Sequence, residues 1–146
     1  MSIRLGMEAK LYRNTGTYGA PVWAEVGNVR DLTLNLEAGE ADVTTRANDG
    51  WRATVATLKE GSIEFEMVWD TADAHFTAIQ DAFFNNTSVE FAVMDGDITV
   101  AGTQGLRATM SITNFSRSEP LEEAVTASVS AKPTFAANPP EWMTVP

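Results

Sequence analysis

The chain has 146 residues, of which 44% are hydrophobic, enough for one ordinary domain with a core of its own. It carries 20 acidic against 10 basic residues, and this formal charge of −10 argues against nucleic-acid binding through clustered lysine and arginine. The absence of cysteine excludes disulfides and thiolate metal sites, so the fold depends on packing and association.

The first eight residues lack the long apolar run of a signal peptide, and no segment approaches the roughly 20 apolar residues needed to span a membrane. We therefore expect synthesis in the cytosol and no membrane insertion. Residues 9–12 form a short candidate strand, and the turn-rich residues 13–21 predict an exposed loop. In residues 28–36, Leu32, Leu34 and Leu36 alternate with Thr33 and Asn35, which predicts a half-buried strand.

Residues 38–61 predict a long polar loop followed by a tight turn. Ala38-Gly39-Glu40 is expected to break the preceding strand, residues 41–45 can form another short strand, and residues 46–50 carry strong loop signals. Residues 51–58 and 62–69 then flank Lys59-Glu60-Gly61, whose length and composition predict a hairpin turn with a positive φ at Gly61.

Residues 62–70 alternate between polar and apolar side chains, so one face of this strand is apolar and the other carries Glu64 and Glu66. A helix is predicted next, over about residues 71–84, with Asp70 or Thr71 as its cap and Asn85-Asn86 as its end. One stripe of this helix is apolar, because its residues are spaced four, three and four apart: Ala72, Phe76, Ile79 and Phe83.

Alternation predicts further strands at residues 88–94, 106–113 and 125–131, and Asp95-Gly96-Asp97 predicts a tight turn into a partner strand at residues 98–101. Residues 132–146 contain Pro133, Pro139, Pro140 and Pro146, which predicts an extended arm outside the sheet. Trp142 in such an arm needs a pocket. We expect a β domain at residues 1–135 and a proline-rich C-terminal arm at residues 136–146.

The predicted elements amount to a mainly-β fold with seven to nine strands, an antiparallel two-sheet sandwich or barrel with one flanking α-helix. No set of residues indicates catalysis. His75 is the only histidine, and on a helix it points about 200° away from Asp73. Asp95 and Asp97 lack the ligand series of an EF-hand loop. We therefore predict no enzyme activity, no metal and no cofactor.

The order of these elements and several short segments resemble the major tail tube proteins of long-tailed bacteriophages, a family related to the inner-tube proteins of type VI secretion systems. The matching segments lie within residues 29–135: Val29-Arg30-Asp31-Leu32, Glu40-Ala41-Asp42-Val43-Thr44, Gly61-Ser62-Ile63-Glu64-Phe65-Glu66 with the following helix, Met110-Ser111-Ile112-Thr113-Asn114-Phe115, and Glu119-Pro120-Leu121-Glu122-Glu123-Ala124-Val125.

This resemblance implies a structural virion protein that assembles as hexameric rings, stacked into a hollow tube through which DNA passes without specific binding. It implies a location in the virion tail, assembly in the host cytoplasm, and contacts with the tape measure, tail terminator and baseplate or initiator proteins. Six copies would carry about −60 charges per ring, and carboxylates lining the bore would repel phosphates.

Three groups of residues are assigned roles under this resemblance. Glu64 and Glu66 are the candidates for the bore, and Trp142 is the candidate anchor of the C-terminal arm. The candidate inter-ring contact is the long loop with Glu40, Asp42, Arg46, Asn48 and Asp49, because a polar excursion of this length in a compact domain is usually functional. Two alternatives stay open: a soluble ligand-binding β-sandwich, such as a carbohydrate-binding module, and another virion ring protein, such as a tail terminator or baseplate component.

Overall fold

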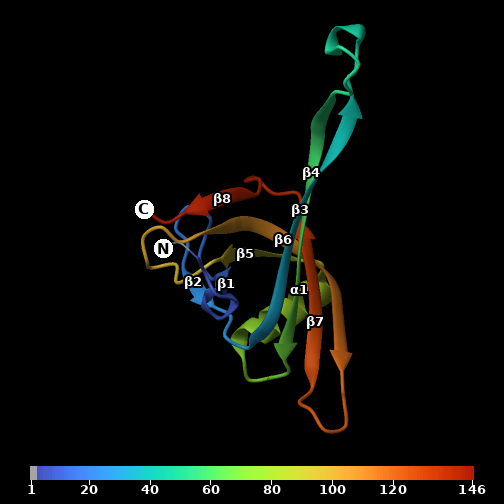
Figure 1. The fold of residues 1–146 in the computed structure, drawn as a ribbon. Helices are drawn as coiled ribbons and strands as arrows, with labels where there is room; N and C mark the ends of the chain where they lie inside the picture. The colour runs from blue at the N-terminus through green and yellow to red at the C-terminus, as the bar shows by residue number, and fades with distance from the viewer. Residues whose placement is uncertain (1–2) are drawn as a thin grey trace.

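The computed structural model describes residues 3–146 and shows a mainly-β, antiparallel protein with a single α-helix, as the sequence predicts (Figure 1). Short 3₁₀ turns occur at Gly6–Glu8 and Arg46–Asn48. The strands and the helix are, in chain order, β1 (Lys10–Asn14), β2 (Trp23–Glu25), β3 (Val29–Asp42), β4 (Thr54–Val68), α1 (Ala74–Asn85), β5 (Ser88–Met94), β6 (Gln104–Ser118), β7 (Thr126–Pro133) and β8 (Glu141–Thr144).

All eight strands belong to one hydrogen-bonded sheet in the order β2-β1-β5-β6-β7-β4-β3, with β8 paired to β6 beside β7. The two layers of the predicted sandwich are thus halves of a single sheet that folds over on itself and does not close into a barrel. Long β6 belongs to both halves, and a register shift between Ile112 and Asn114 marks an irregularity of the kind that bends strands. Phe65 and Phe91 meet between the layers with ring centroids 6.1 Å apart, although β4 and β5 are not neighbours.

The helix covers the open side of this folded sheet and completes the core. Phe76 and Ile79 of the predicted apolar stripe are buried, and Phe83 packs against the same core. Phe76 also contacts Trp69 edge to face at a centroid distance of 4.6 Å, and Phe115 of β6 lies 5.9 Å from Phe76. These aromatic contacts fix α1 against the sheet.

The start of the helix differs from the prediction, whereas its end agrees. The cap is Asp73, which accepts a hydrogen bond from the Phe76 amide at 3.2 Å. Asp70 instead closes a turn by accepting from the Ala72 amide. The predicted caps at Asp70 and Thr71 were therefore wrong by two or three residues, because a run of capping residues offers several competing turns. Asn86 ends the helix in the left-handed conformation with φ 54°.

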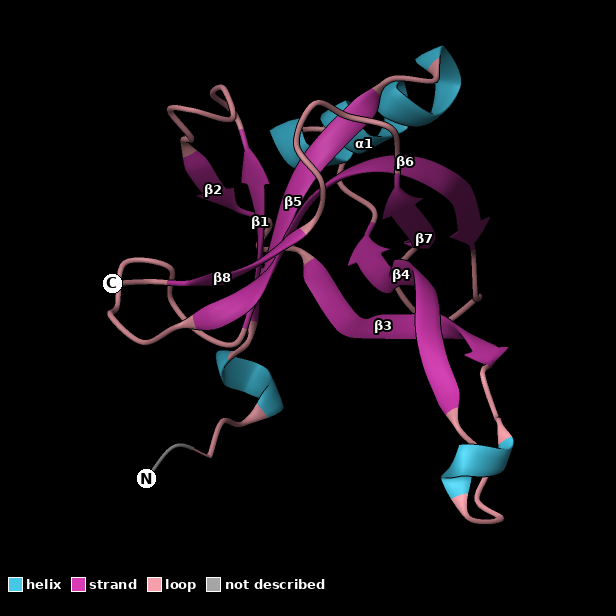
Figure 2. Cartoon of the chain, turned by 90° about the horizontal axis from the view of Figure 1, so that it is seen from above, coloured by secondary structure: helices cyan, strands magenta, loops and turns pink. Residues whose placement is uncertain are grey.

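Strands β3 and β4 form one long hairpin whose outer half projects from the body as an arm (Figures 1 and 2). The predicted strand break at Ala38-Gly39-Glu40 was wrong, because β3 continues through these residues as far as Asp42, which lies opposite Thr54. The pairing with β4 shifts by one residue between Ala38 and Glu40, so these residues carry an irregularity within a continuous strand. Cross-strand pairing outweighs the low strand propensity of Ala and Gly here. The predicted long loop is therefore a paired arm whose loop proper is confined to residues 43–53.

The predicted hairpin turn at Lys59-Glu60-Gly61 was also wrong. These residues lie inside β4, opposite Ala38, Glu37 and Leu36 respectively. Gly61 does not have a positive φ; a Cβ added there would come within 3.1 Å of the Leu36 side chain, so glycine permits close approach of the two strands. The reversal occurs at the arm end instead, where Asp49 and Gly50 have φ 50° and 83°.

Two later predictions need correction. Residues 98–101 form turns and no partner strand; β5 pairs with β6, and Thr103 is buried in the connection, where its hydroxyl donates to the Asp97 carbonyl at 2.8 Å. Residues 132–146 do not all lie outside the sheet, because β8 pairs with β6 from Gln104 to Arg107. Pro139, Pro140 and Pro146 lie outside this strand, so they leave its hydrogen bonds intact, whereas Pro133 is the last residue of β7. The division at residue 135 stays a prediction.

Arg107 of β6 is 8% exposed and ties four segments together. Its guanidinium forms an ion pair with Glu90 of β5, donates to the Tyr18 carbonyl at 2.7 Å, and lies 3.8 Å from the centroid of the Tyr18 ring. Trp23 of β2 and Glu141 of β8 also lie beside it, at 5.1 Å and 3.9 Å. A single buried cation thus holds the N-terminal loop and the C-terminal strand to the body.

Replacing Arg107 with methionine is expected to lower the free energy of unfolding by about 3–5 kcal/mol, because Glu90 would stay buried without its cation. The double variant R107M/E90L removes both charges, so its free energy of unfolding should fall less than that of R107M alone. Urea unfolding followed by tryptophan fluorescence measures both. A stability of R107M within about 1 kcal/mol of the wild type would contradict this role of Arg107.

Candidate functional site: a polar sheet face and an extended arm

One face of the folded sheet is polar across four neighbouring strands. In one row, Thr33 of β3, Glu64 of β4, Ser130 of β7 and Asn114 of β6 lie side by side. In the next row Glu66 lies beside Ser128, which lies beside Ser116. The residues between them on β4, namely Ile63, Phe65 and Met67, are buried in the core. The predicted strand alternation is confirmed, and it places Glu64 and Glu66 on the same outward face.

Carboxylates outnumber cations on this polar face. Asp31, Glu64 and Glu66 line a shallow depression of about 370 Å³ together with Asn114, Ser128 and Ser130. Glu66 forms an ion pair with Arg30 at 3.7 Å, in which both side chains are largely solvent-accessible. Lys132 extends the same alternation on β7 and is exposed. The alternation also continues to Glu37 of β3 and Glu60 of β4, which lie opposite each other and are exposed. Five carboxylates and two cations therefore leave this face acidic, and small hydroxyl side chains lie between them.

The arm exposes apolar side chains along its whole length. Trp51 is 78% exposed and Leu58 is 83% exposed. Leu36, Val43 and Val55 are exposed as well. Apolar residues gathered on a projecting element with no core of its own are typical of a surface that another protein chain covers.

Both ends of the chain add exposed apolar residues, which include Ile3, Met7 and Phe135. Trp142 lies on β8, is 57% exposed, and donates from its indole nitrogen to Gln104 Oε1 at 3.0 Å. More than half of the side chain of the predicted anchor is therefore accessible to a neighbouring molecule.

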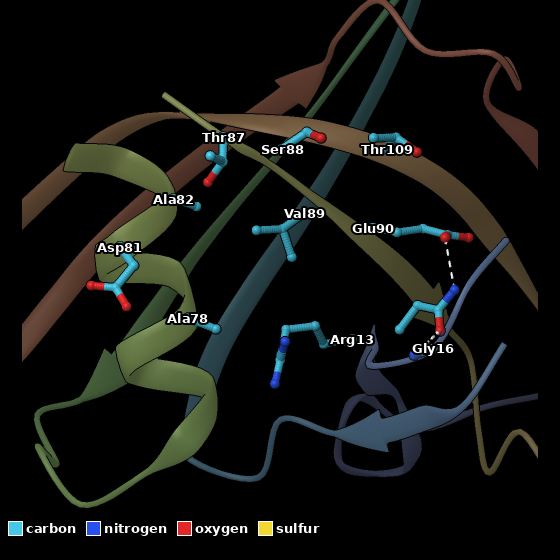
Figure 3. A pocket seen from close by; sticks show the side chains of 11 residues that line it. Arg13, Gly16, Ala78, Asp81, Ala82, Thr87, Ser88, Val89, Glu90 and Thr109 are labelled. Atoms are coloured by element: carbon cyan, nitrogen blue, oxygen red, sulfur yellow. Dashed lines mark hydrogen bonds between the residues drawn. The ribbon is translucent and has the colours of Figure 1, made fainter. Parts of the chain in front are cut away.

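A groove of about 380 Å³ lies between α1, β5 and the end of β1 (Figure 3). Two of its charged groups are paired: Glu90 accepts from Asn14 and pairs with Arg107, and Arg13 Nε donates to His75 Nδ1 at 2.9 Å. The third, Asp81 of α1, is exposed and has no ion pair among residues 3–146. His75 is partly exposed, as predicted, and burial followed by the Arg13 charge lowers its pKa, against a smaller opposing effect of Asp73. The imidazole and the buried carboxylate of the groove are therefore engaged in structural contacts, and its free carboxylate, Asp81, has no paired base beside it in the hydrogen bonds of the described residues.

Among residues 3–146 no group of three or more His, Asp or Glu side chains could hold a metal ion. In the same part of the chain no helix is both long and apolar enough to cross a membrane.

A family model described as phage tail tube protein matches residues 10–134. The chain belongs to this family. It is a structural protein of a phage-type tail, and the match covers every strand except β8. The comparison with curated proteins gives no match.

Solved structures share the fold. A chain in the tail of an empty gene transfer agent particle, refined with C6 symmetry, is 18% identical with a TM-score of 0.73, over 99% of this chain and 100% of that chain. The SPP1 tail tube protein is 19% identical with a TM-score of 0.70, over 89% of this chain and 75% of that one. A chain of the anti-feeding prophage baseplate is 10% identical with a TM-score of 0.63, over 99% of each chain.

The structure keeps Glu64 and Glu66 together but separates them from the other candidate residues. Glu40 and Asp42 lie in the paired part of β3, whereas Arg46, Asn48 and Asp49 form the end of the arm.

Sequence reasoning missed Arg107, because its position in an alternating strand indicated an exposed side chain. No signal in the sequence separates Arg107 and Glu90 from exposed strand residues, since Glu64 and Glu66 also have apolar neighbours on either side and lie on the outward face.

Stability should fall with acidification in a way that depends on His75. Its pKa is lowered in the folded protein, so as pH falls below 6.5 the unfolded chain takes up the proton first, and the unfolding free energy decreases until the folded pKa is passed. In His75→Gln, an amide oxygen can still accept from Arg13 but does not titrate.

Melting temperatures measured between pH 7.5 and pH 5 should therefore drop less for H75Q than for the wild type. An equal or larger drop for H75Q would show that His75 does not contribute to the pH dependence.

Proposed function

We propose that this chain is the major tail tube subunit, assembled as hexameric rings that stack into a hollow tube for the passage of DNA to the host. The observation that carries the proposal is the family match over residues 10–134, taken with an arm that exposes apolar side chains and has no core of its own. The gene transfer agent tail, a structural neighbour, has C6 symmetry, which supports six copies per ring.

Ring closure accounts for the open sheet. β3 and β2 end the strand order, so each has an edge without a partner among the described residues. Free edges invite uncontrolled pairing, and a closed ring of subunits removes them by continuing the sheet from one copy to the next. A rotational assembly of identical copies also repeats one contact six times, so a modest interface suffices.

The polar sheet face is the proposed wall of the bore, with Glu64 and Glu66 facing the DNA. Its carboxylates outnumber its cations, although Arg30 and Lys132 offset part of this charge. The DNA can then pass without binding for two reasons. The wall has no cluster of lysine or arginine that would neutralise phosphates and release their counterions, and its remaining side chains are mostly short hydroxyls. Glu64 and Glu66 contribute to the net negative charge of this wall.

The remaining parts have roles outside the bore. The arm, with Arg46, Asn48 and Asp49 at its end, is the proposed contact to the next ring, and Trp142 on β8 is the proposed anchor to a neighbouring copy. The tape measure, terminator and baseplate or initiator proteins would contact the ends of the tube or fill its bore. The role is structural and not enzymatic, with assembly in the host cytoplasm before incorporation into the virion tail.

Electron microscopy of the purified protein tests the proposal, with tail initiator proteins added where elongation needs them. Rings and hollow tubes are expected. A baseplate or terminator protein would instead give single rings that do not elongate, and persistent monomers under all conditions would contradict the assembly itself.

Replacing residues 43–53 by Asn-Gly should leave a folded, ring-forming protein that does not elongate into tubes. Asp42 and Thr54 already lie opposite each other, so a two-residue turn can join them, and the 3₁₀ turn at Arg46–Asn48 buries no side chain. Circular dichroism and size-exclusion chromatography check the fold and the rings. Normal tubes from this variant would show that the arm end is not the ring-to-ring contact.

The double variant E64K/E66K should assemble into tubes that retain linear DNA, whereas wild-type tubes do not. The reversal adds four positive charges per copy to the proposed wall, and retention should weaken steeply with added salt. The neutral variant E64Q/E66Q is the matched control and should lie between the two. Binding that is equal in all three kinds of tube would place these residues outside the bore.

A further inference from the structure

Two surfaces of opposite charge lie at the two ends of β4. The arm tip, residues 43–53, precedes Thr54 at one end of this strand. At the other end, Val68 pairs with Thr126, the first residue after the β6–β7 connection. β4 has 15 residues, so these ends lie on the order of 45 Å apart at about 3.3 Å per residue. In Figure 1 the arm and the β6–β7 connection point in opposite directions.

The arm tip is cationic although the protein is strongly acidic. Residues 43–53 contain Arg46 and Arg52 against Asp49, a net charge of +1 in a chain of net charge −10. The Asp42 carboxylate at the base of the tip accepts from the Thr44 amide at 2.9 Å, and the two arginines are the cations that the tip presents. Both arginines are exposed, and neither forms an ion pair with any residue that the structure describes. Trp51 stands between them in an open position.

The opposite surface, which we name the acidic end, consists of residues 117–125 and Asp70. Asp70 belongs to it because the amide of the preceding residue, Trp69, donates to the Val125 carbonyl at 2.8 Å. Glu119 is partly neutralised by Arg117 at 2.8 Å, whereas Glu122 and Glu123 are exposed and have no ion pair among residues 3–146. Leu121 is 99% exposed in their midst.

We propose that the arm tip of one copy docks on the acidic end of a copy in the next ring, with Arg46 and Arg52 facing Glu122 and Glu123 and with Trp51 against Leu121. This inference rests on the proposed function and identifies the surface that receives the arm. The occupant is a second copy of this chain, because each surface is exposed, each carries apolar residues beside unpaired charges, and the charges are complementary.

Such a contact is head-to-tail, which is the kind that repeats without closing and therefore builds a filament of rings. It also gives the stack a direction. Two arm tips repel each other, as do two acidic ends, so a ring added upside down meets like charges at every contact.

Because a ring has six copies, weak ion pairs are sufficient to hold one ring on the next. Exposed ion pairs contribute little individually, but six contacts form together when one ring meets another. If a charge reversal weakens one contact about five-fold, six such contacts weaken ring association by roughly 10⁴. Stacking should therefore respond to charge far more strongly than the folding of a single copy does.

The test uses three charge variants of the full chain under conditions in which the wild type forms tubes. The tip variant is R46E/R52E, the end variant is E122K/E123K, and the swapped variant carries all four substitutions. The tip and end variants should each form rings but no tubes. Mixed together they should form tubes in which the two kinds of ring alternate, since only unlike rings then present opposite charges on both sides.

The swapped variant should form tubes alone and should not enter wild-type tubes. D81K, which reverses an exposed carboxylate of α1 outside both surfaces, is the matched control and should leave stacking unchanged. Size-exclusion chromatography and electron microscopy distinguish monomers, rings and tubes, and differently labelled variants report co-assembly.

The inference is overturned if the tip and end variants stack like the wild type, if their mixture stays as rings, or if the tip variant loses rings as well as tubes, which would make the arm a contact within the ring. Failure of the proposed function is a separate result, because it appears in the wild type as an absence of rings and tubes.

Discussion

The unbroken strand β4 (Thr54–Val68) is the element on which the rest of the structure depends. Its inner half buries Ile63, Phe65 and Met67 in the core, and this burial fixes the register with β3 and β7. Because side chains alternate along a strand, a slip of one residue would bury Glu64 and Glu66 and expose the core residues. The hydrophobic core thus determines which side chains form the polar face. The same strand continues outward into the arm, where its pairing with β3 shifts by one residue between Ala38 and Glu40.

Several surfaces that a single chain leaves exposed are consistent with a subunit that assembles with other copies. The arm has no core to cover Trp51 and Leu58, the sheet ends in free edges at β3 and β2, and Trp142 keeps most of its surface open. Arg107 shows the opposite tendency, because it gathers the N-terminal loop, β2, β5 and β8 around one buried ion pair. The subunit therefore has a body that is closed by contacts between distant segments of the chain, and extensions whose apolar side chains are left exposed.

The parts of the fold that depend on local patterns could be predicted from the sequence. Alternation located β5 and the inner half of β4, and the spacing of Phe76 and Ile79 located the helix. The arm could not be predicted in this way. Lys59-Glu60-Gly61 has the composition of a turn but is held straight by pairing with residues 36–38, a contact between segments that composition does not reveal. The pairing of β8 depends likewise on the β6 strand, more than thirty residues earlier in the chain.

The direct test of the central claim is a cryo-electron microscopy reconstruction of the assembled tube, read for the residues that line its bore. The account predicts that the outward faces of β3, β4, β6 and β7 form the wall, with Glu64 and Glu66 in contact with the lumen. Glu64 and Glu66 enclosed in a subunit interface, or a lumen coated with lysine and arginine, would contradict it.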